Sequence, residues 1–138
     1  MKTLYEAKAT AKGGRNGKVE SNDGLISMTT RVPKSMGGEG GNYTNPEQLF
    51  AATFSTCYNG ALDLVIEQEG VETGQTSVTA TIGIGKQKDG LGINAVLEAN
   101  IPGVDKETGM KLMEKAHQVC PYSKATRGNI DVELRLAE

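Results

Sequence analysis

The sequence predicts a single α+β domain over residues 1–138, with strands and helices in the order βββ-α-ββ-α-β. Three observations indicate this class: short segments of alternating apolar residues, two longer segments with helical spacing, and glycine-rich turns between them. Runs of strands separated by single helices favour antiparallel sheets over a doubly wound parallel fold. At 138 residues the chain is long enough to bury one core and too short for two.

The first elements are expected to form an antiparallel meander. Strands at 4–10 and 18–21 flank a glycine-rich turn that carries Arg15, and a third strand is expected at 25–32. Residues 33–45 show no hydrophobic period and predict a long surface loop, the kind of segment that often carries or covers a site.

A central helix is expected over about 46–68. Asn45 is a favoured N-cap, Pro46 suits the first helical position, and Gln48 stands where a capping-box partner belongs. Apolar residues recur at helical spacing on one face, and that face includes Cys57. Much of the opposite side is also small or uncharged, which suits burial on several sides or a subunit contact.

The second half of the sequence predicts a hairpin, a second helix and a final strand. Two alternating segments, 78–84 and 91–101, flank a turn, and a third alternating segment lies at 130–136. Asp105 is a good cap for the second helix. This helix must end near Cys120 because the proline that follows disfavours helical geometry in the residue before it. Residues 123–128 then form a short turn or helical piece.

Composition excludes several classes of protein. The net charge is -2 and Lys and Arg are scattered, so nucleic acid is not an expected partner. No segment approaches the length of an apolar membrane span, and the N-terminus lacks the features of a signal peptide. Two cysteines are too few for a secreted domain that depends on disulfides. A soluble cytoplasmic protein without a membrane partner is therefore expected.

The residues that offer chemistry are Cys57, Cys120, Arg15 and Glu47. A reactive cysteine needs a cationic donor that stabilises its thiolate, and a second thiol offers a route back from sulfenic acid. Burial on a helix face raises the pKa of a thiol, so a reactive Cys57 requires a positive charge nearby. Arg15 offers that charge, and Glu47 offers a carboxylate that its planar guanidinium can bind through two hydrogen bonds.

Other interpretations of these residues remain open at this stage. Each cysteine can be one more buried apolar residue, and Arg15 and Glu47 can be solvated or placed by the helix dipole. His117 and Cys120 share a helix face at i, i+3 and could bind a metal with Cys57, but a structural zinc site wants four ligands. No cofactor or metal site is therefore expected. A non-enzymatic binder of a lipid-like ligand, or a redox sensor, is the alternative function.

Two long motifs give the sequence a resemblance to the Ohr/OsmC family, in its organic hydroperoxide resistance branch. They are NPEQLFAATFSTCYNGAL at 45–62 and AHQVCPYSKATRGNIDV at 116–132, and the GGRNG and DGLGI turns extend the resemblance along essentially the whole chain. The resemblance implies a dithiol peroxidase on an intertwined α+β homodimer, with two active sites at the subunit interface and the central helices buried within it.

The resemblance also implies a role for each candidate residue. Cys57 in FSTCYNG is the peroxidatic cysteine and Cys120 in VCPYS the resolving one, while Arg15 in GGRNG is the active-site arginine and Glu47 in NPEQLF its acidic partner. The implied substrates are alkyl and fatty-acid hydroperoxides, and lipoylated proteins are the implied dithiol reductant. Thr53-Phe54 stands where many members have Gly-Tyr, so the pocket wall is expected to differ here.

Overall fold

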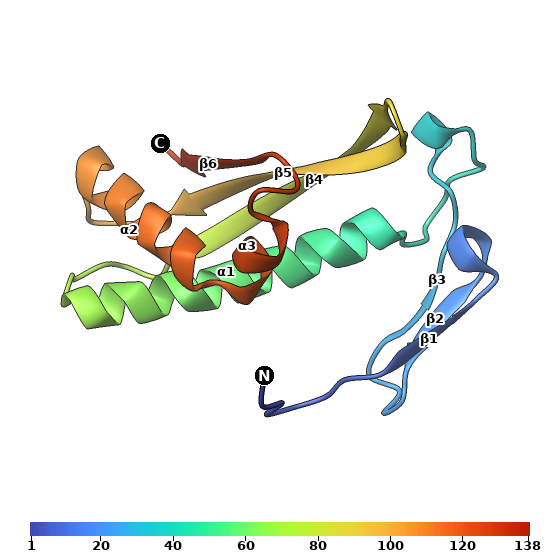
Figure 1. Ribbon diagram of the computed structural model, residues 1–138, viewed down its shortest axis with the longest axis horizontal. Coiled ribbons are helices and arrows are strands. Elements are labelled where there is room, and N and C mark those ends of the chain that lie inside the picture. The colour runs from blue at the N-terminus through green and yellow to red at the C-terminus, as the bar shows by residue number, and fades with distance from the viewer. The chain divides into compact units, whose positions relative to one another are not determined.

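A computed structural model describes all 138 residues, which group into two compact units, Met1–Leu49 and Phe50–Glu138 (Figure 1). The elements follow the predicted order of three strands, a helix, two strands, a helix and a final strand. Short additional helices interrupt this series at three places. The α+β class is therefore confirmed, whereas the single domain over 1–138 stays a prediction.

The N-terminal unit contains an antiparallel three-stranded sheet in the order β1-β2-β3. Its strands are Ala9–Lys12 (β1), Lys18–Ser21 (β2) and Ser27–Thr29 (β3), with 3-10 turns at Gly14–Asn16 (η1) and Lys34–Met36 (η2). The first and third strands are shorter than predicted, because β2 alone pairs with both and is only 4 residues long. The apolar residues at 4–8 consequently lie before any strand.

The C-terminal unit contains the second sheet, in the order β4-β5-β6. Its strands are Ser77–Gln87 (β4), Gly90–Asn100 (β5) and Val132–Leu136 (β6). The pair β4 and β5 is an antiparallel hairpin, as predicted, but β6 pairs with β5 in the parallel sense. The parallel pairing follows from the long helical crossover that connects β5 to β6, since the crossover carries the chain back to the end of the sheet at which β5 begins.

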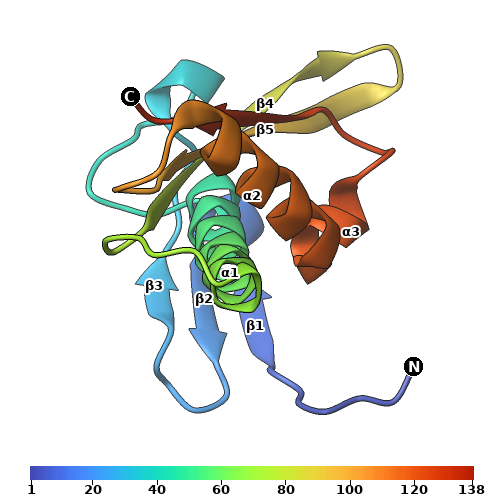
Figure 2. The same cartoon turned by 90° about the vertical axis from the view of Figure 1, so that its left-hand side faces the viewer.

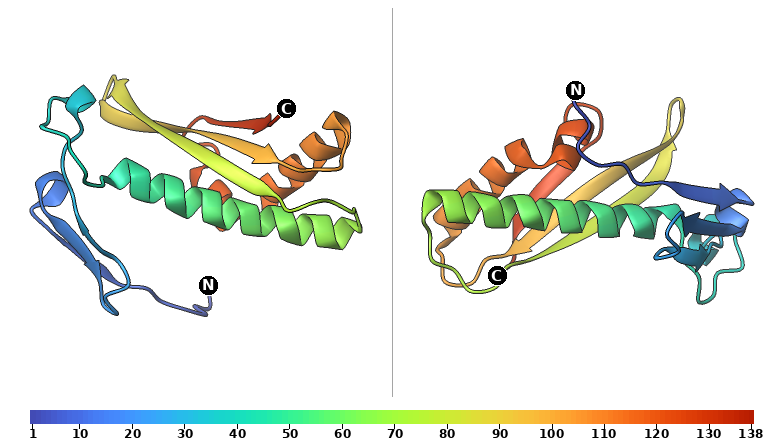
Figure 3. Two further views of the ribbon diagram at one scale, coloured as in Figure 1. Left: turned by 180° about the vertical axis from the view of Figure 1, so that it is seen from behind. Right: turned by 90° about the horizontal axis from the view of Figure 1, so that it is seen from below.

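Three helices accompany this sheet: Pro46–Glu69 (α1), Lys106–Val119 (α2) and Pro121–Thr126 (α3). The first is one continuous helix that begins in the N-terminal unit and runs on through the C-terminal one. Figures 2 and 3 show the strands β4, β5 and β6 on one side of α1 and α2. The crossover helix α2 approaches β6 closely, because Gly109 leaves room for the Leu136 side chain.

The core lies between these helices and the inner face of the β4-β5-β6 sheet. Alternate residues of β5, namely Ala95, Leu97 and Ala99, are buried, as the alternating sequence predicts. The core also takes side chains from α1 and α2, including Phe54, Tyr58, Leu62, Leu112 and Met113. Both cysteines belong to this packing, Cys120 inside it and Cys57 against its edge.

The helix α1 corrects the expectation that no segment approaches a membrane span. It has 24 residues, and by length and composition its most apolar window, with a mean hydropathy of 1.3, is sufficient to cross a membrane. About a third of that window, 33%, is buried in the protein, and the core helix of a soluble protein meets the same criteria. The expectation rested on unbroken apolar runs, whereas α1 mixes apolar residues with small uncharged ones.

Candidate active site

Cys57 lies near the middle of α1 and packs against the edge of the core while remaining partly exposed. Its neighbour Tyr58 is fully buried, as is Phe54 one turn earlier. Phe54 also stacks on Phe50, with the ring centroids 5.8 Å apart. The helical spacing that predicted an apolar face thus holds Cys57 on a rigid element at the border between core and surface.

Cys120 is fully buried at the corner between α2 and α3. Its ψ of 123° is extended, as expected for a residue that precedes proline. Its backbone N–H donates to the Ala116 carbonyl at 2.9 Å and closes the end of α2. Its sulfur accepts the backbone N–H of Ser123 at 3.5 Å and so caps the start of α3. One residue therefore ends one helix and begins the next.

The fold brings the two thiols together although they are far apart in the sequence. Burial raises the pKa of the Cys57 thiol, and the side-chain hydrogen bond to Cys120 and the charge of that group raise it further. The backbone N–H of Tyr122 acts in the opposite sense and lowers this pKa. Both cysteines are free. The C-terminal unit thus holds a reduced thiol pair, but its own environment disfavours the Cys57 thiolate.

Tyr58 fastens the helix of one thiol to the helix of the other. Its hydroxyl donates to the Met113 carbonyl of α2 at 2.6 Å. Burial, and to a smaller extent the charge of Cys120, raise the pKa of Tyr58 above its ordinary range, so the hydroxyl stays protonated and keeps donating. Sequence analysis did not single out this residue. Its signal was a tyrosine within the apolar face of a helix, where a buried hydroxyl must find a partner.

Arg15 and Glu47 form a two-pronged ion pair within the N-terminal unit. The Arg15 Nη1 donates to Glu47 Oε2 at 2.9 Å, and Nη2 donates to Oε1 at 2.6 Å. The Glu47 side chain is only 14% exposed, against 35% for Arg15. The hydrogen bond from Arg15 is the main cause that lowers the pKa of Glu47, and burial opposes it. The pair thus stays charged, with most of its exposure on the arginine.

The turn that carries Arg15 is shaped by glycine and fixed by one buried threonine. Gly13 adopts a φ of 77°, a left-handed conformation that favours glycine, and a Cβ at Gly17 would overlap the carbonyl oxygen of Lys12. Thr30 Oγ1 accepts the Gly17 backbone N–H at 3.0 Å and donates to the Gly14 carbonyl at 2.8 Å. These bonds explain why an arginine in a glycine-rich turn has a defined position.

Glu47 is held in the first turn of α1 by the predicted cap. The side chain of Asn45 accepts the backbone N–H of Gln48 at 2.8 Å. Gln48 does not complete a capping box, because its side chain accepts from the Thr44 hydroxyl at 2.9 Å.

The structure shows no grouping of ligands for the zinc site that was considered as an alternative. No three or more side chains of His, Cys, Asp or Glu are grouped to hold a metal ion. His117, the residue on which this alternative depended, instead places its Nδ1 2.8 Å from the Ser123 hydroxyl.

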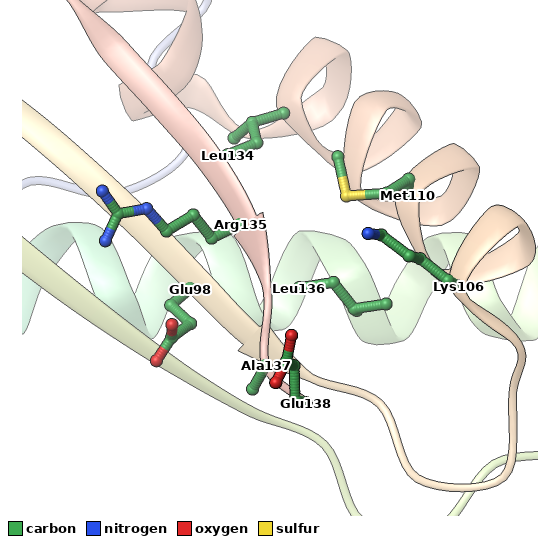
Figure 4. A pocket seen from close by; sticks show the side chains of 8 residues that line it. All are labelled: Glu98, Lys106, Met110, Leu134, Arg135, Leu136, Ala137 and Glu138. Atoms are coloured by element: carbon green, nitrogen blue, oxygen red, sulfur yellow. The ribbon is translucent and has the colours of Figure 1, made fainter.

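A cavity of about 680 Å³ between α2 and β6 lies away from the thiols (Figure 4). Its floor is apolar and its rim carries charges of both signs; the lining residues are Glu98, Lys106, Met110, Leu134, Arg135, Leu136, Ala137 and Glu138. Its lining contains no cysteine, serine or histidine. The thiol pair, and not this cavity, is therefore the candidate active site.

Comparison with known proteins identifies the family. The family described as OsmC-like protein matches residues 38–135. A relative from Xanthomonas axonopodis pv. citri (strain 306), named organic hydroperoxide resistance protein, is 48% identical over 137 residues, which cover 99% of this chain and 96% of the relative. The chain belongs to the OsmC family, in its organic hydroperoxide resistance branch.

Solved structures of this branch have the same fold as the present OsmC family member. An organic hydroperoxide resistance protein from Elizabethkingia anophelis, with thiocyanate bound, aligns with a TM-score of 0.94 at 53% identity and covers 100% of this chain and 99% of its own. The organic hydroperoxide resistance protein OhrB of Bacillus subtilis aligns with a TM-score of 0.89 at 38% identity, over 98% and 100% of the two chains. The resemblance that the motifs indicated is confirmed.

Proposed function

We propose that the protein is a thiol peroxidase that reduces organic hydroperoxides to alcohols and so protects against organic peroxide stress. The observation that carries this proposal is the pair of free thiols that pack in one core cluster, one partly exposed on α1 and the other buried at the α2–α3 corner. A partly exposed thiol can meet a substrate, and a buried partner in contact with it can close a disulfide. The names of the relatives support the same substrate class.

In the first step, the Cys57 thiolate attacks the terminal oxygen of the hydroperoxide. The sulfur donates an electron pair, the O–O bond breaks, and the alkoxide leaves with a proton as the alcohol, which leaves Cys57 as a sulfenic acid. The thiolate needs a compensating charge because burial raises the pKa of Cys57. Arg15 is our candidate for that charge, with Glu47 as the carboxylate that orients it, since two hydrogen bonds fix the plane of its guanidinium.

In the second step, Cys120 attacks the sulfur of the Cys57 sulfenic acid. The S–O bond breaks, water leaves with the proton of the Cys120 thiol, and a Cys57–Cys120 disulfide forms. A dithiol then restores both thiols by two exchange reactions and is itself oxidised to a disulfide. We propose a lipoylated protein as this reductant and alkyl or fatty-acid hydroperoxides as the substrates. Two free cysteines suit a reducing compartment, and we propose the cytoplasm.

The functional form is proposed to be an intertwined homodimer with its active sites at the subunit interface. The N-terminal unit supports this proposal, because Thr30 is its only buried residue. Several of its large apolar side chains are exposed in the single chain, namely Leu4, Tyr5, Leu25, Ile26 and Met28. Apolar surface of this extent is typical of a region that another chain covers.

The test is rapid-mixing reduction of an alkyl hydroperoxide by the fully reduced protein, with thiol counting and mass analysis of the product. We expect two thiols to disappear per peroxide and a peptide crosslink between Cys57 and Cys120 to appear. Unchanged thiols and unconsumed peroxide would overturn the proposal and favour the ligand-binding alternative. A reaction with hydrogen peroxide in parallel measures the preference for organic substrates, and a lipoamide-coupled assay tests the reductant.

A further inference from the structure

We propose that His117 and Ser123 are positioning residues for the resolving step, because they close the corner at which Cys120 sits. The inference rests on the proposed function and assigns to it two residues that sequence analysis did not. His117 was considered only as a metal ligand, and Ser123 was not considered at all. The structure joins them by a hydrogen bond of 2.8 Å between His117 Nδ1 and Ser123 Oγ.

The two residues are placed symmetrically about Cys120. His117 lies three residues before it, on the last turn of α2, and Ser123 lies three residues after it, in the first turn of α3. The corner between the helices has no continuous backbone ladder, since Pro121 supplies no N–H. The His117–Ser123 bond therefore spans the corner with side chains where the backbone cannot.

Ser123 also contacts the sulfur directly through its backbone. Its N–H is the donor that points at Cys120 Sγ, at 3.5 Å. Ser123 is fully buried, and its hydroxyl depends on His117 as a partner. The hydrogen bond that holds the Ser123 side chain therefore also holds the Ser123 backbone N–H in its position facing Cys120 Sγ. An N–H donor that faces a sulfur favours its thiolate, and the thiolate is the form that attacks.

His117 is in turn held from the far side of α3. Arg127 Nη1 donates to the His117 carbonyl at 2.7 Å, and the Arg127 backbone N–H donates to the Ser123 carbonyl at 2.8 Å. Burial, and then the charge of Arg127, lower the pKa of His117 below its ordinary value. Both causes favour the neutral ring, which has one nitrogen that donates and one that accepts.

This arrangement acts chiefly on the second step. Peroxide attack uses the Cys57 sulfur on α1, which makes no hydrogen bond to either residue. Disulfide closure requires Cys120 Sγ to meet the Cys57 sulfur in line with the breaking S–O bond, and a displacement of about 1 Å can slow such a step by up to about a hundredfold. The corner bond keeps that geometry in place.

The experiment follows the lifetime of the Cys57 sulfenic acid by quenched flow, with a sulfenic-acid trap and mass analysis. The variants are Ser123→Ala, which keeps the backbone N–H, and His117→Leu. The conservative variant His117→Asn keeps a hydrogen-bonding atom near the position of Nδ1. Ser77→Ala, an exposed serine on β4, is the matched control. Thermal unfolding of each variant shows whether it is folded.

We expect the first step to keep its rate in all variants, while disulfide closure slows about tenfold or more in Ser123→Ala and His117→Leu. His117→Asn should recover most of the rate, and Ser77→Ala should match the wild type. Sulfenic acid that closes at the wild-type rate in both Ser123→Ala and His117→Leu would overturn the inference. So would an equal loss in both steps, since that result indicates a general structural role.

Oxidation by diamide separates this inference from the proposed function. Diamide accepts the two electrons of a dithiol and becomes a hydrazine, so it forms the Cys57–Cys120 disulfide without any peroxidase activity. The same order of variants with diamide supports the corner role even if the hydroperoxide is not a substrate. Equal rates of closure with diamide in wild type, Ser123→Ala and His117→Leu would contradict the role whatever the peroxide assay gives.

Discussion

The two units of the chain differ in what they bury and in the chemistry they carry. The C-terminal unit has a packed core and holds both thiols, in surroundings that raise the pKa of Cys57. The N-terminal unit has one buried residue and holds the Arg15–Glu47 ion pair, in surroundings that keep both groups charged. Each unit thus holds one part of the chemistry that the proposed peroxide reduction requires.

A core and a charged group place opposite demands on a site. Burial fixes the thiols and excludes water, but it also disfavours the thiolate that must attack. A guanidinium keeps its charge and can bind a carboxylate through two hydrogen bonds, as Arg15 binds Glu47 in a partly exposed pair. In the proposed reaction, the C-terminal unit supplies the geometry of the thiols and the N-terminal unit supplies the charge.

The largest effect is expected from the two cysteines. Cys57→Ser should abolish peroxide reduction, because a serine hydroxyl does not supply a thiolate. Cys120→Ser should keep one turnover and then accumulate sulfinic acid at Cys57, since no thiol resolves the sulfenic acid. Single-turnover peroxide consumption with mass analysis measures both. Equal residual activity in the two variants would show that the two thiols do not have separate roles in the reaction.

Arg15→Gln is expected to have the next largest effect, on the first step only. Removal of one preorganised charge or donor from a reaction costs about a hundredfold in rate, so peroxide consumption should slow to about that extent while disulfide closure is spared. Lys18→Gln is the matched control, because it removes a positive charge from the same unit but from an exposed ion pair. Equal rates in the two variants would show that the N-terminal unit supplies no catalytic charge.

The stability of the units should respond differently to apolar substitutions. Leu62 is fully buried, so Leu62→Ala should lower the free energy of unfolding by about 2–5 kcal/mol. Met28 is 42% exposed in the single chain, and its proposed cover is a second copy, so Met28→Asp should weaken the dimer at least about tenfold. Chemical denaturation measures the unfolding free energy of Leu62→Ala, and analytical sedimentation measures the dimer affinity of Met28→Asp. Ser27→Asp, on the opposite face of β3, is the control, and dimer loss in both variants would contradict this choice of face.

The smallest effect concerns acid. The pKa of Glu47 is lowered by Arg15, so the ion pair stabilises the fold above the ordinary glutamate pKa of about 4.3 and loses this contribution as pH falls through the lowered value. Because Arg15 is about a third exposed, the contribution should not exceed about 1 kcal/mol. The free energies of unfolding of wild type and Glu47→Gln, measured as a function of pH, should thus converge at low pH. Parallel curves down to the lowest pH would contradict the pairing.

The sequence predicted the elements better than their limits and their partners. The N-cap at Asn45 and the helix end at Cys120 are local signals, so the helices were predicted nearly to the residue. The first strand was predicted too early, because a strand exists only where its partner runs alongside it. The parallel pairing of β6 was missed for the same reason, since it depends on the path of the crossover.

The candidate site was predictable by residue type and not by arrangement. Cys57 and Cys120 stood out as the only cysteines, but the contact between them depends on how α2 packs against α1. Tyr58 and Ser123 went unrecognised, since each looks like an ordinary helix residue until its buried hydroxyl and partner are seen. What remains a prediction is the step that joins the charge of Arg15 to the thiol of Cys57.

That step is tested most directly by titrating the Cys57 thiolate. In a Cys120→Ala background only one thiol is left, and its ultraviolet absorbance follows the thiolate as pH rises. The account predicts that Cys57 titrates below the ordinary thiol pKa of about 8.5 with Arg15 present and above it in Arg15→Gln. The same high pKa in both proteins would contradict the claim that the charge of the N-terminal unit activates the thiol of the C-terminal one.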